Sequence, residues 1–135
     1  MCGIAGAISF AEDMRADMKI YEKMQRTLLH RGPDQRGIVL TREAALIHTR
    51  LAVIDIDGGR QPMTFAGEQG TFIIVYNGEL YNTQELRREL ETEFAFETGS
   101  DTEVVLKSYV KWGENCVERF NGIYAFVIYE QQSAR

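Results

Sequence analysis

The stretch TFIIVYNGELYN, residues 71–82, joins an apolar run to a polar turn signal. Thr71 to Tyr76 is rich in β-branched and aromatic residues and has no polar alternation, which predicts a strand buried on both faces. Asn77-Gly78 follows at once and is a frequent turn dipeptide, so the strand is predicted to end there. The stretch therefore predicts an internal strand of a layered fold, and the segments on either side supply the other elements.

Two helices and a strand are predicted after this stretch. Asn82 and Ser100 each precede a glutamate by three residues, which is the capping-box pattern of a helix N-terminus. The apolar residues that then recur at helical spacing are Leu86, Leu90, Val105, Tyr109 and Trp112. After the turn Asn121-Gly122, the apolar run Ile123 to Tyr129 predicts a last strand.

The segments before residue 71 predict further strands and one more helix. Cys2 to Phe10 is small and apolar, as in a buried strand. Apolar residues recur every three or four positions between Met14 and Leu29, which predicts a helix that stops before Pro33. Gly37 to Leu40 and Ala44 to Ile56 predict a hairpin turning near residues 41–43. About five strands and at least three helices, in separate layers, indicate an α+β fold.

Length, composition and charge exclude several classes of protein. The 135 residues fit one domain, and 44% hydrophobic with 26% charged residues is typical of a folded protein in water. A net charge of −5 argues against a nucleic-acid surface, which needs clustered Lys and Arg. No apolar run reaches the roughly 18 residues of a membrane span, and no basic leader precedes the first strand. A cytoplasmic location is expected.

Cys2 and Cys116 are two separate thiols. They lie far apart and form no CxxC or CxxH group, so neither a metal site nor a disulfide framework is predicted. Removal of Met1 would leave Cys2 with a free α-amine, whose pKa of about 7.7–8.0 lies close to the thiol pKa of about 8.5. Cys2 can then act as nucleophile and base together. Its position alone, however, favours an ordinary buried strand cysteine.

Six short motifs strengthen the catalytic interpretation when they are taken in order. They are Cys2-Gly3-Ile4, His30-Arg31-Gly32-Pro33-Asp34, His48-Thr49-Arg50-Leu51, Gln61-Pro62-Met63, Tyr76-Asn77-Gly78-Glu79-Leu80-Tyr81-Asn82 and Gly99-Ser100-Asp101-Thr102-Glu103. In this order they resemble the class II, N-terminal nucleophile glutamine amidotransferases, and most closely the glutaminase domain of asparagine synthetase. The resemblance runs from Met1 to about Tyr129 and implies the layered helix/sheet/sheet/helix fold of N-terminal nucleophile hydrolases.

The resemblance implies a reaction and a catalytic set. The Cys2 thiolate would attack the side-chain amide of glutamine and release ammonia, and water would then release glutamate from the thioester, with the α-amine of Cys2 as general base. Asn77 and Gly78 match the family's oxyanion hole, and both offer neutral donors suited to it. Read without the family, Asn77-Gly78 is more simply a type I′ hairpin turn.

The resemblance also implies a substrate pocket. Arg50 matches the arginine that holds the α-carboxylate of glutamine, whereas an isolated strand arginine usually faces solvent. Asp101 matches the acid that accepts the α-ammonium, although an acid in a first helical turn also suits the helix dipole. The remaining residues expected to bind substrate are Glu79 and, from a segment that reads simply as core, Leu51, Val53 and Ile54.

Three other residues invite functional roles that are not favoured. His30 and His48 suggest a cysteine–histidine pair, but neither has an identifiable orienting partner and the N-terminal amine makes a histidine base unnecessary. His30 fits the turn with Pro33, and His48 fits a strand. Cys116 lies at helical spacing from Phe120 and is expected to pack in the core.

The chain departs from the family at its end. It stops at Arg135, where relatives continue with more glutaminase sequence and then an ATP- and magnesium-dependent synthetase domain. Residues 1–135 are therefore expected to form a partial glutaminase domain, truncated at the C-terminus, with no cofactor of its own. The expected partners are L-glutamine and a synthetase domain or subunit that receives ammonia. An unpaired sheet edge also suggests a homodimer.

Two other functions compete with this one. A phosphosugar- or nucleotide-pathway amidotransferase is disfavoured by residues 31–34 and 50–55, because those relatives usually carry Trp after the arginine. A non-catalytic fragment that keeps the fold and binds glutamine or a partner is the other alternative. A retained Met1 would favour it, because the α-amine would then be blocked.

Overall fold

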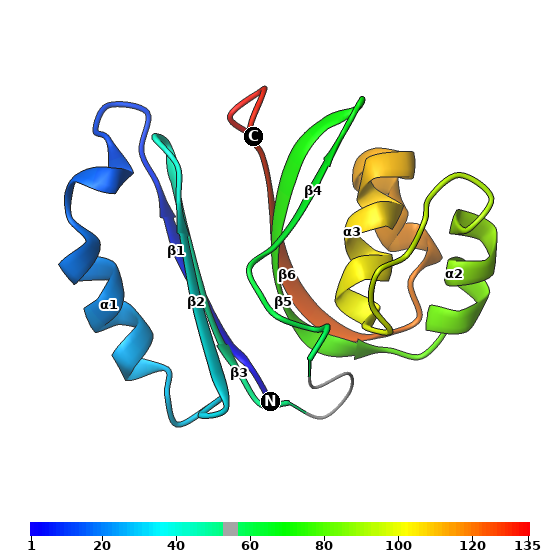
Figure 1. Cartoon of the computed structure of the whole chain (residues 1–135), viewed down its shortest axis with the longest axis horizontal. Coiled ribbons are helices and arrows are strands. Elements are labelled where there is room, and N and C mark those ends of the chain that lie inside the picture. Colours follow the sequence, from blue (N-terminus) through cyan, green and yellow to red (C-terminus); the bar gives the residue numbers. More distant parts are fainter. Residues whose placement is uncertain (53–56) are drawn as a thin grey trace.

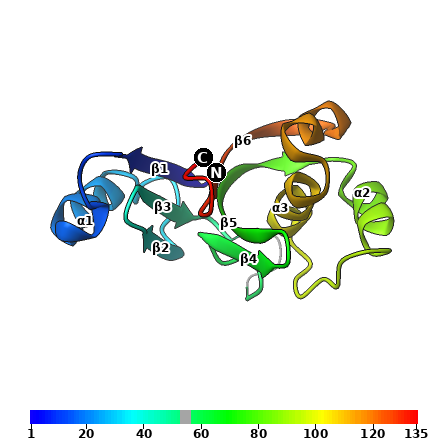
Figure 2. The ribbon, with the colours of Figure 1, turned by 90° about the horizontal axis from the view of Figure 1, so that it is seen from above.

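The computed structural model describes residues 1–52 and 57–135, and it has four layers. Two three-stranded antiparallel sheets face each other, with one helix outside the first sheet and two helices outside the second (Figure 1). Figure 2 shows the same layers from above, with α1 and the pair α2 and α3 at opposite sides. The predicted α+β class and the helix/sheet/sheet/helix arrangement are confirmed.

The first sheet holds the N-terminus and is covered by α1. Its order is β1 (Gly3–Ile8), β3 (Ala44–Arg50), β2 (Gln35–Leu40), so β3 is central and buried along its whole length. α1 (Met18–Thr27) covers the outer face through a cluster of Met14, Tyr21, Ala45 and Ile47. The predicted hairpin between β2 and β3 is confirmed, but the predicted strand from Ala44 to Ile56 ends at Arg50.

The predicted helix over residues 14–29 is wrong at its N-terminal end. Met14–Ala16 forms a short 3-10 helix, and α1 begins only at Met18. Asp17 separates the two because its side chain accepts a hydrogen bond from the backbone N–H of Lys19, which caps α1. Asp13 caps the 3-10 helix in the same way through Arg15 N. One continuous helix and two separate helices would show the same spacing of apolar residues. Only Asp13 and Asp17 therefore mark the break in the sequence.

The second sheet contains a strand that was not predicted and one that is longer than predicted. Its order is β4 (Met63–Gly67), β5 (Gly70–Leu80), β6 (Gly122–Glu130). β5 does not end at Tyr76: Asn77 pairs with Ala125 and Gly78 with Tyr124. The hairpin-turn interpretation of Asn77-Gly78 is therefore wrong, because β6 pairs with this segment from far along the chain. Gly78 suits the position, since a Cβ there would lie 2.5 Å from the carbonyl oxygen of Ile123.

The helices outside the second sheet follow the predicted order, with one difference in capping. α2 (Thr83–Leu90), α3 (Asp101–Trp112) and a 3-10 helix (Gly113–Arg119) pack on a core of β5 and α3 side chains. Ser100 caps α3 by accepting a hydrogen bond from Glu103 N at 3.4 Å, as predicted. Asn82 makes no side-chain cap. Its amide instead bonds the Arg119 carbonyl and the Asn121 N–H, which holds the start of α2 to the start of β6.

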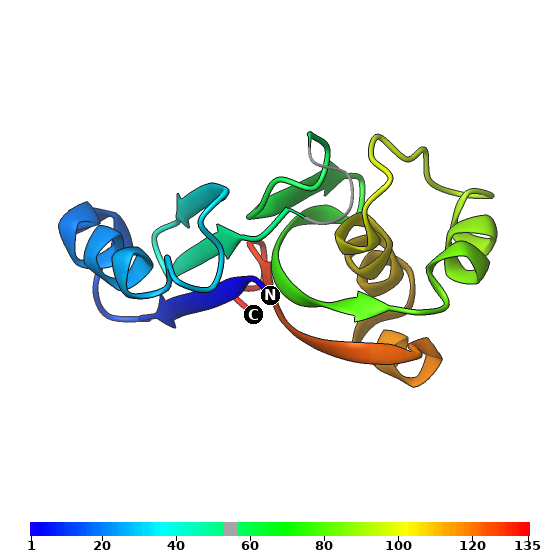
Figure 3. The ribbon, with the colours of Figure 1, turned by 90° about the horizontal axis from the view of Figure 1, so that it is seen from below.

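The layer between the sheets changes character along its length. At one end it is apolar, with Leu46 of β3 packed in a cluster with Ile73 and Val75 of β5. Because side chains alternate along a strand, His48 and Arg50 continue the same face of β3 toward the other end. The N-terminus lies between the sheets at this polar end (Figure 3).

Among residues 1–52 and 57–135, none of the helices combines the length and the apolar character that a bilayer span requires.

Candidate functional site

The polar end of the intersheet layer opens into a cavity of about 500 Å³. Seven of the nine residues predicted for the site line it, and they come from the N-terminus, β3, β5 and α3. They are Cys2, Arg50, Leu51, Asn77, Gly78, Glu79 and Asp101. The other two, Val53 and Ile54, lie outside the described residues. Residues separated by up to a hundred positions in the sequence thus meet at one place.

Cys2 lines this cavity and is held there by its backbone. Arg31 Nε donates to the Cys2 carbonyl at 3.1 Å, and the Cys2 Sγ lies 3.8 Å from the carbonyl oxygen of Leu51. Gly3, the next residue, packs so closely that a Cβ would meet Thr49 Oγ1 at 2.6 Å. Met1 is 72% exposed and lines the same cavity.

The turn at residues 30–34 fixes the end of β3. Asp34 N donates to the Arg50 carbonyl at 3.0 Å, and Asp34 Oδ2 accepts from Ala52 N at 2.8 Å. Gly32 allows this approach, because a Cβ there would lie 2.5 Å from the Thr49 carbonyl. The second of the six motifs thus sets where Arg50 and Leu51 leave the sheet, a role that sequence reasoning did not find.

Arg50 is buried, which excludes the solvent-facing alternative. Its side chain is on the intersheet face and the residue is only 5% exposed. Nη1 donates to Gln35 Oε1 at 2.7 Å, so one edge of the guanidinium is anchored to β2. A planar guanidinium fixed in this way is suited to bidentate binding of a carboxylate.

Backbone N–H groups of β5 form a row beside the cavity. β4 reaches β5 only as far as the pair Met63 and Ile74, so beyond it that side of β5 has no partner strand among residues 1–52 and 57–135. There Tyr76 N donates to Gln61 Oε1 at 2.6 Å and Leu80 N donates to Asp101 Oδ2 at 3.3 Å. Because N–H groups alternate in direction along a strand, the Gly78 N–H points to this same side, between the other two.

This row contains a backbone donor that suits the predicted oxyanion hole. The two flanking N–H groups are bound by side chains, and the Gly78 N–H between them faces the cavity that Gly78 lines. Asn77 lines the same cavity with a neutral amide. Neutral donors of this kind, fixed in place before a reaction, are what stabilises a developing oxyanion.

Asp101 has a structural role in addition to the one predicted. It is the first residue of α3, and its Oδ2 accepts hydrogen bonds from Tyr76 Oη at 2.9 Å and from Leu80 N. Burial first, and then the neighbouring Asp101 charge, raise the pKa of Tyr76 above its usual range. Tyr76 therefore stays a neutral donor that orients the carboxylate. Asp101 and Glu79 bring negative charge to the wall of the cavity, which Arg50 also lines.

The two histidines do not line the cavity, which argues against a cysteine–histidine pair. His48 is buried, and its Nε2 lies 3.1 Å from the Tyr76 carbonyl, which identifies it as the protonated nitrogen. Nδ1 is buried with no hydrogen-bond partner among the described residues. Burial, opposed by the bond to Tyr76 and aided by the Arg50 charge, lowers the pKa of His48 to about 4.

This low pKa makes stability depend on pH. Because unfolded His48 titrates near 6.5 and folded His48 near 4, its contribution is complete above pH 6.5 and is lost as pH falls toward 4. The loss is about 3 kcal/mol, at about 1.4 kcal/mol per pKa unit. Urea unfolding of wild type and His48→Gln between pH 7 and 4 measures this loss as the difference between their free energies of unfolding. His30→Gln, at the exposed histidine, is the control, and parallel curves for wild type and His48→Gln would contradict the expectation.

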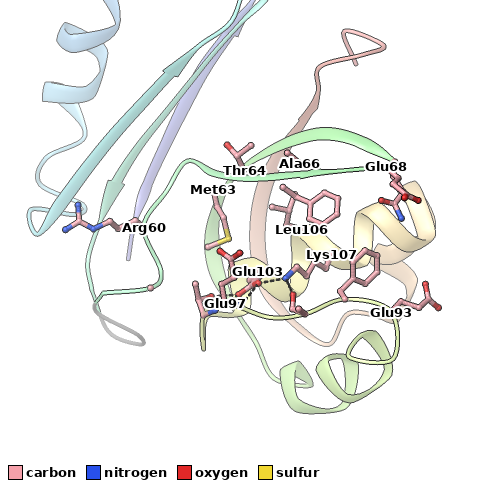
Figure 4. Close-up of a pocket in the computed structure, with 16 residues that line it drawn as sticks. Arg60, Met63, Thr64, Ala66, Glu68, Glu93, Glu97, Glu103, Leu106 and Lys107 are labelled. Carbon is pink, nitrogen blue, oxygen red and sulfur yellow. Dashed lines mark hydrogen bonds and ion pairs between the residues drawn. The ribbon is translucent and has the colours of Figure 1, made fainter.

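A second cavity, of about 650 Å³, lies between β4, α3 and residues 93–98 and is lined by none of the seven described site residues (Figure 4). At its floor Lys107 forms a buried ion pair with Glu103 and donates to the Ala95 carbonyl. The Glu103 carboxylate also accepts from Glu97 N at 3.0 Å and from Thr98 N at 2.7 Å. This pair ties the segment between α2 and α3 to α3 and serves the fold.

Removal of one partner of this ion pair is expected to lower the free energy of unfolding. Lys107→Met leaves Glu103 as an uncompensated buried charge, which destabilises by about 3–5 kcal/mol. The exposed pair Arg119–Glu89 supplies the control, since Arg119→Met should cost about 0–1 kcal/mol. Chemical denaturation of both variants tests this. The double variant Glu103→Gln/Lys107→Met should recover part of the loss, and a Lys107→Met cost no larger than that of Arg119→Met would contradict the assignment.

Comparison with known proteins agrees with this geometry. The family model described as "Glutamine amidotransferase domain" matches residues 1–135. Asparagine synthetase [glutamine-hydrolyzing] 3 of Bacillus subtilis is 44% identical over 133 residues, covering 98% of this chain and 22% of the relative. Asparagine synthetase B of Escherichia coli is 36% identical, covering 98% of this chain and 24% of the relative. The chain thus spans about a quarter of the length of these curated relatives.

A solved structure adds a likeness in fold. The glutamine phosphoribosylpyrophosphate amidotransferase from B. subtilis has a TM-score of 0.58 and 28% sequence identity, covering 68% of this chain and 22% of that one. The sequence match over the whole chain and the structural match together confirm the predicted family. This chain belongs to the glutamine amidotransferase domain family.

Proposed function

We propose that this chain hydrolyses the side-chain amide of L-glutamine through Cys2 and passes the ammonia to an amide-forming synthetase domain or subunit. The observation that carries the proposal is the meeting of Cys2, Asn77, Gly78, Arg50 and Asp101 around one cavity. A nucleophile, neutral oxyanion donors and a pair of opposite charges are the groups that such a reaction on a zwitterionic amide requires.

The reaction follows from these groups in two halves. With Met1 removed, the α-amine of Cys2 takes the thiol proton and the thiolate adds to the amide carbon. Asn77 and the Gly78 N–H stabilise the tetrahedral oxyanion. Its collapse breaks the C–N bond, the ammonium returns the proton to the leaving nitrogen, and ammonia departs. Water, deprotonated by the same amine, then adds to the thioester carbon, and glutamate leaves as the Cys2 thiol is regenerated.

Substrate selection rests on the charges of the cavity. Arg50 binds the α-carboxylate through its guanidinium group, and Asp101 binds the α-ammonium with Glu79 beside it. Leu51 lines the same cavity, and Val53 and Ile54 stay predicted substrate contacts outside the described residues. Because both charged groups on the α-carbon of glutamine are held, the side-chain amide at the other end is left to face Cys2, and this fixed orientation lowers the entropic part of the barrier.

Amide synthesis is the favoured destination of the ammonia. The relatives named asparagine synthetase are 36–44% identical over almost the whole chain, whereas the phosphoribosylpyrophosphate amidotransferase is 28% identical over 68% of it. This chain spans 22–24% of the length of those relatives, so the amide-forming step is proposed for a synthetase domain or subunit and not for residues 1–135.

A substrate truncation tests the proposed pocket. Removing the α-carboxylate from glutamine gives 4-aminobutanamide, and we expect kcat/KM of wild type to fall by about 10- to 100-fold, the value of a charge-assisted hydrogen bond. Arg50→Met should show a similar loss of kcat/KM with glutamine. With 4-aminobutanamide its kcat/KM should be little lower than that of wild type.

The control is Arg88→Met, at an exposed arginine of α2. This variant should leave the ratio of kcat/KM for the two substrates as in wild type. A wild-type protein with a free Cys2 that releases no ammonia from glutamine would contradict the hydrolase proposal and favour a non-catalytic fragment. Equal loss with both substrates in Arg50→Met would contradict only the assigned contact.

A further inference from the structure

Gln61 bonds two elements of the site, although the sequence motif Gln61-Pro62-Met63 suggests no role for it. It lies two residues before β4, lines the cavity, and donates from Nε2 to Thr102 Oγ1 at 3.1 Å. Its Oε1 accepts from Tyr76 N, the first donor of the β5 row described above. One side chain thus links the strand that carries Asn77 and Gly78 to the helix that begins with Asp101.

The sheet register explains why a side chain is needed here. Met63 pairs with Ile74, so a continued β4 would place residue 61 opposite Tyr76. The ladder between β4 and β5 stops at this pair and does not reach Tyr76. The Tyr76 N–H would then lack a backbone acceptor, and the Gln61 side chain supplies one. A primary amide fits because its oxygen accepts from the strand while its nitrogen donates to the helix.

The backbone of Gln61 is itself fixed from the other sheet. Gly37 of β2 packs against it so closely that a Cβ would overlap the Gln61 carbonyl. The Gly37 carbonyl in turn accepts from Gln25 Nε2 of α1 at 2.9 Å. Gln61 is therefore held by the first sheet and holds the second sheet and α3, which makes it a bridge between the two walls of the cavity.

We infer that Gln61 is a positioning residue, which sets the Gly78 N–H and Asn77 on β5 relative to Asp101 on α3. The inference rests on the proposed glutamine hydrolysis for its kinetic consequence. Loss of the bond to Thr102 frees the first turn of α3, and so Asp101, whereas loss of both bonds also frees the β5 donors. A misplacement of about 1 Å in such a site can cost about 100-fold in rate.

Three variants and a control test this. Gln61→Met removes both bonds at similar size and is expected to lower kcat and raise KM for glutamine, with kcat/KM down by about tenfold or more. Thr102→Val removes only the helix bond and should raise KM by about 3- to 10-fold while kcat stays near wild type. Thr102→Ser keeps the hydroxyl and should recover that loss. Gln84→Met, at an exposed glutamine of α2, is the matched control.

If Gln61 had only a structural role, the variants would have lower melting temperatures but would keep the wild-type kcat and KM when assayed well below those temperatures. That result would overturn the inference. Hydrogen exchange of the Tyr76 N–H supplies a readout that does not depend on activity. Exchange should be about tenfold faster in Gln61→Met than in Gln84→Met, and equal exchange would overturn the assigned bond. A wild type that shows no hydrolysis contradicts the proposed function, whereas an active wild type matched by Gln61→Met contradicts only the positioning role.

Discussion

Cys2→Ala is expected to reduce ammonia release from glutamine to the uncatalysed background. The substitution removes the thiol that forms the thioester, while the α-amine, the oxyanion donors and the charged residues remain. Cys2→Ser should also be close to inactive, because a hydroxyl holds its proton far more strongly than a thiol at neutral pH. Coupled detection of ammonia and of glutamate, which must appear in equal amounts, measures the effect.

The second thiol of the chain provides the control for this loss. Cys116 is 0% exposed, lies in the 3-10 helix after α3, and has its pKa raised to about 11 by burial. Cys116→Ala should therefore keep the activity of the folded protein. Activity that survives Cys2→Ser, or that disappears in a folded Cys116→Ala, would contradict the assignment of the nucleophile.

Asn77→Ala is expected to lower kcat by about 100- to 1,000-fold, which is the usual cost of removing one oxyanion donor. KM should change little, because the donor is needed for the charge that develops after the substrate has bound. Asn77 lies within β5 and pairs with Ala125, so truncation to alanine leaves the backbone ladder in place. Steady-state kinetics at several glutamine concentrations separate the two parameters.

Asn115→Ala is the matched control, since Asn115 is exposed in the 3-10 helix after α3. Asn77→Asp offers a further comparison, because a carboxylate of the same size has no donor and repels an oxyanion. A loss that appears in KM while kcat stays at the wild-type value would contradict the oxyanion role and indicate ground-state binding.

The sequence predicted the elements that depend on local patterns. The apolar run of β5, the Ser100 cap and the hairpin of β2 and β3 all have short-range causes, and the structure has each of them. Where the predictions were wrong, the cause lies far away in the chain. Asn77-Gly78 has the local signature of a turn, but β6, some 45 residues later in the order of the chain, pairs with it and extends β5 to Leu80.

In the candidate site, too, local sequence predicted some features, and contacts from distant segments determined the others. The family motifs identified seven residues that do line one cavity, because chemistry constrains their type. The contacts that hold them were not predictable: Gln61 bonds Tyr76 only because β4 stops at Met63, and Asp34 bonds Ala52 only because Gly32 lets a turn approach β3. The burial of Arg50 likewise follows from the facing sheet and not from its neighbours in sequence.

Several expectations stay predictions. They are the absence of a cofactor, the cytoplasmic location, the homodimer and the assignment of residues 1–135 as a partial glutaminase domain. The same holds for removal of Met1, on which the chemistry depends, because an amide nitrogen bonded to Met1 cannot serve as the base.

Rapid acid quenching of a single turnover with glutamine, followed by mass spectrometry of the N-terminal peptide, tests the central claim most directly. We predict a peptide that begins at Cys2 and carries one γ-glutamyl group on its thiol, which appears and then decays as glutamate forms. Glutamine hydrolysis by a protein whose Met1 is still attached, or by one whose γ-glutamyl group forms at a residue other than Cys2, would contradict it.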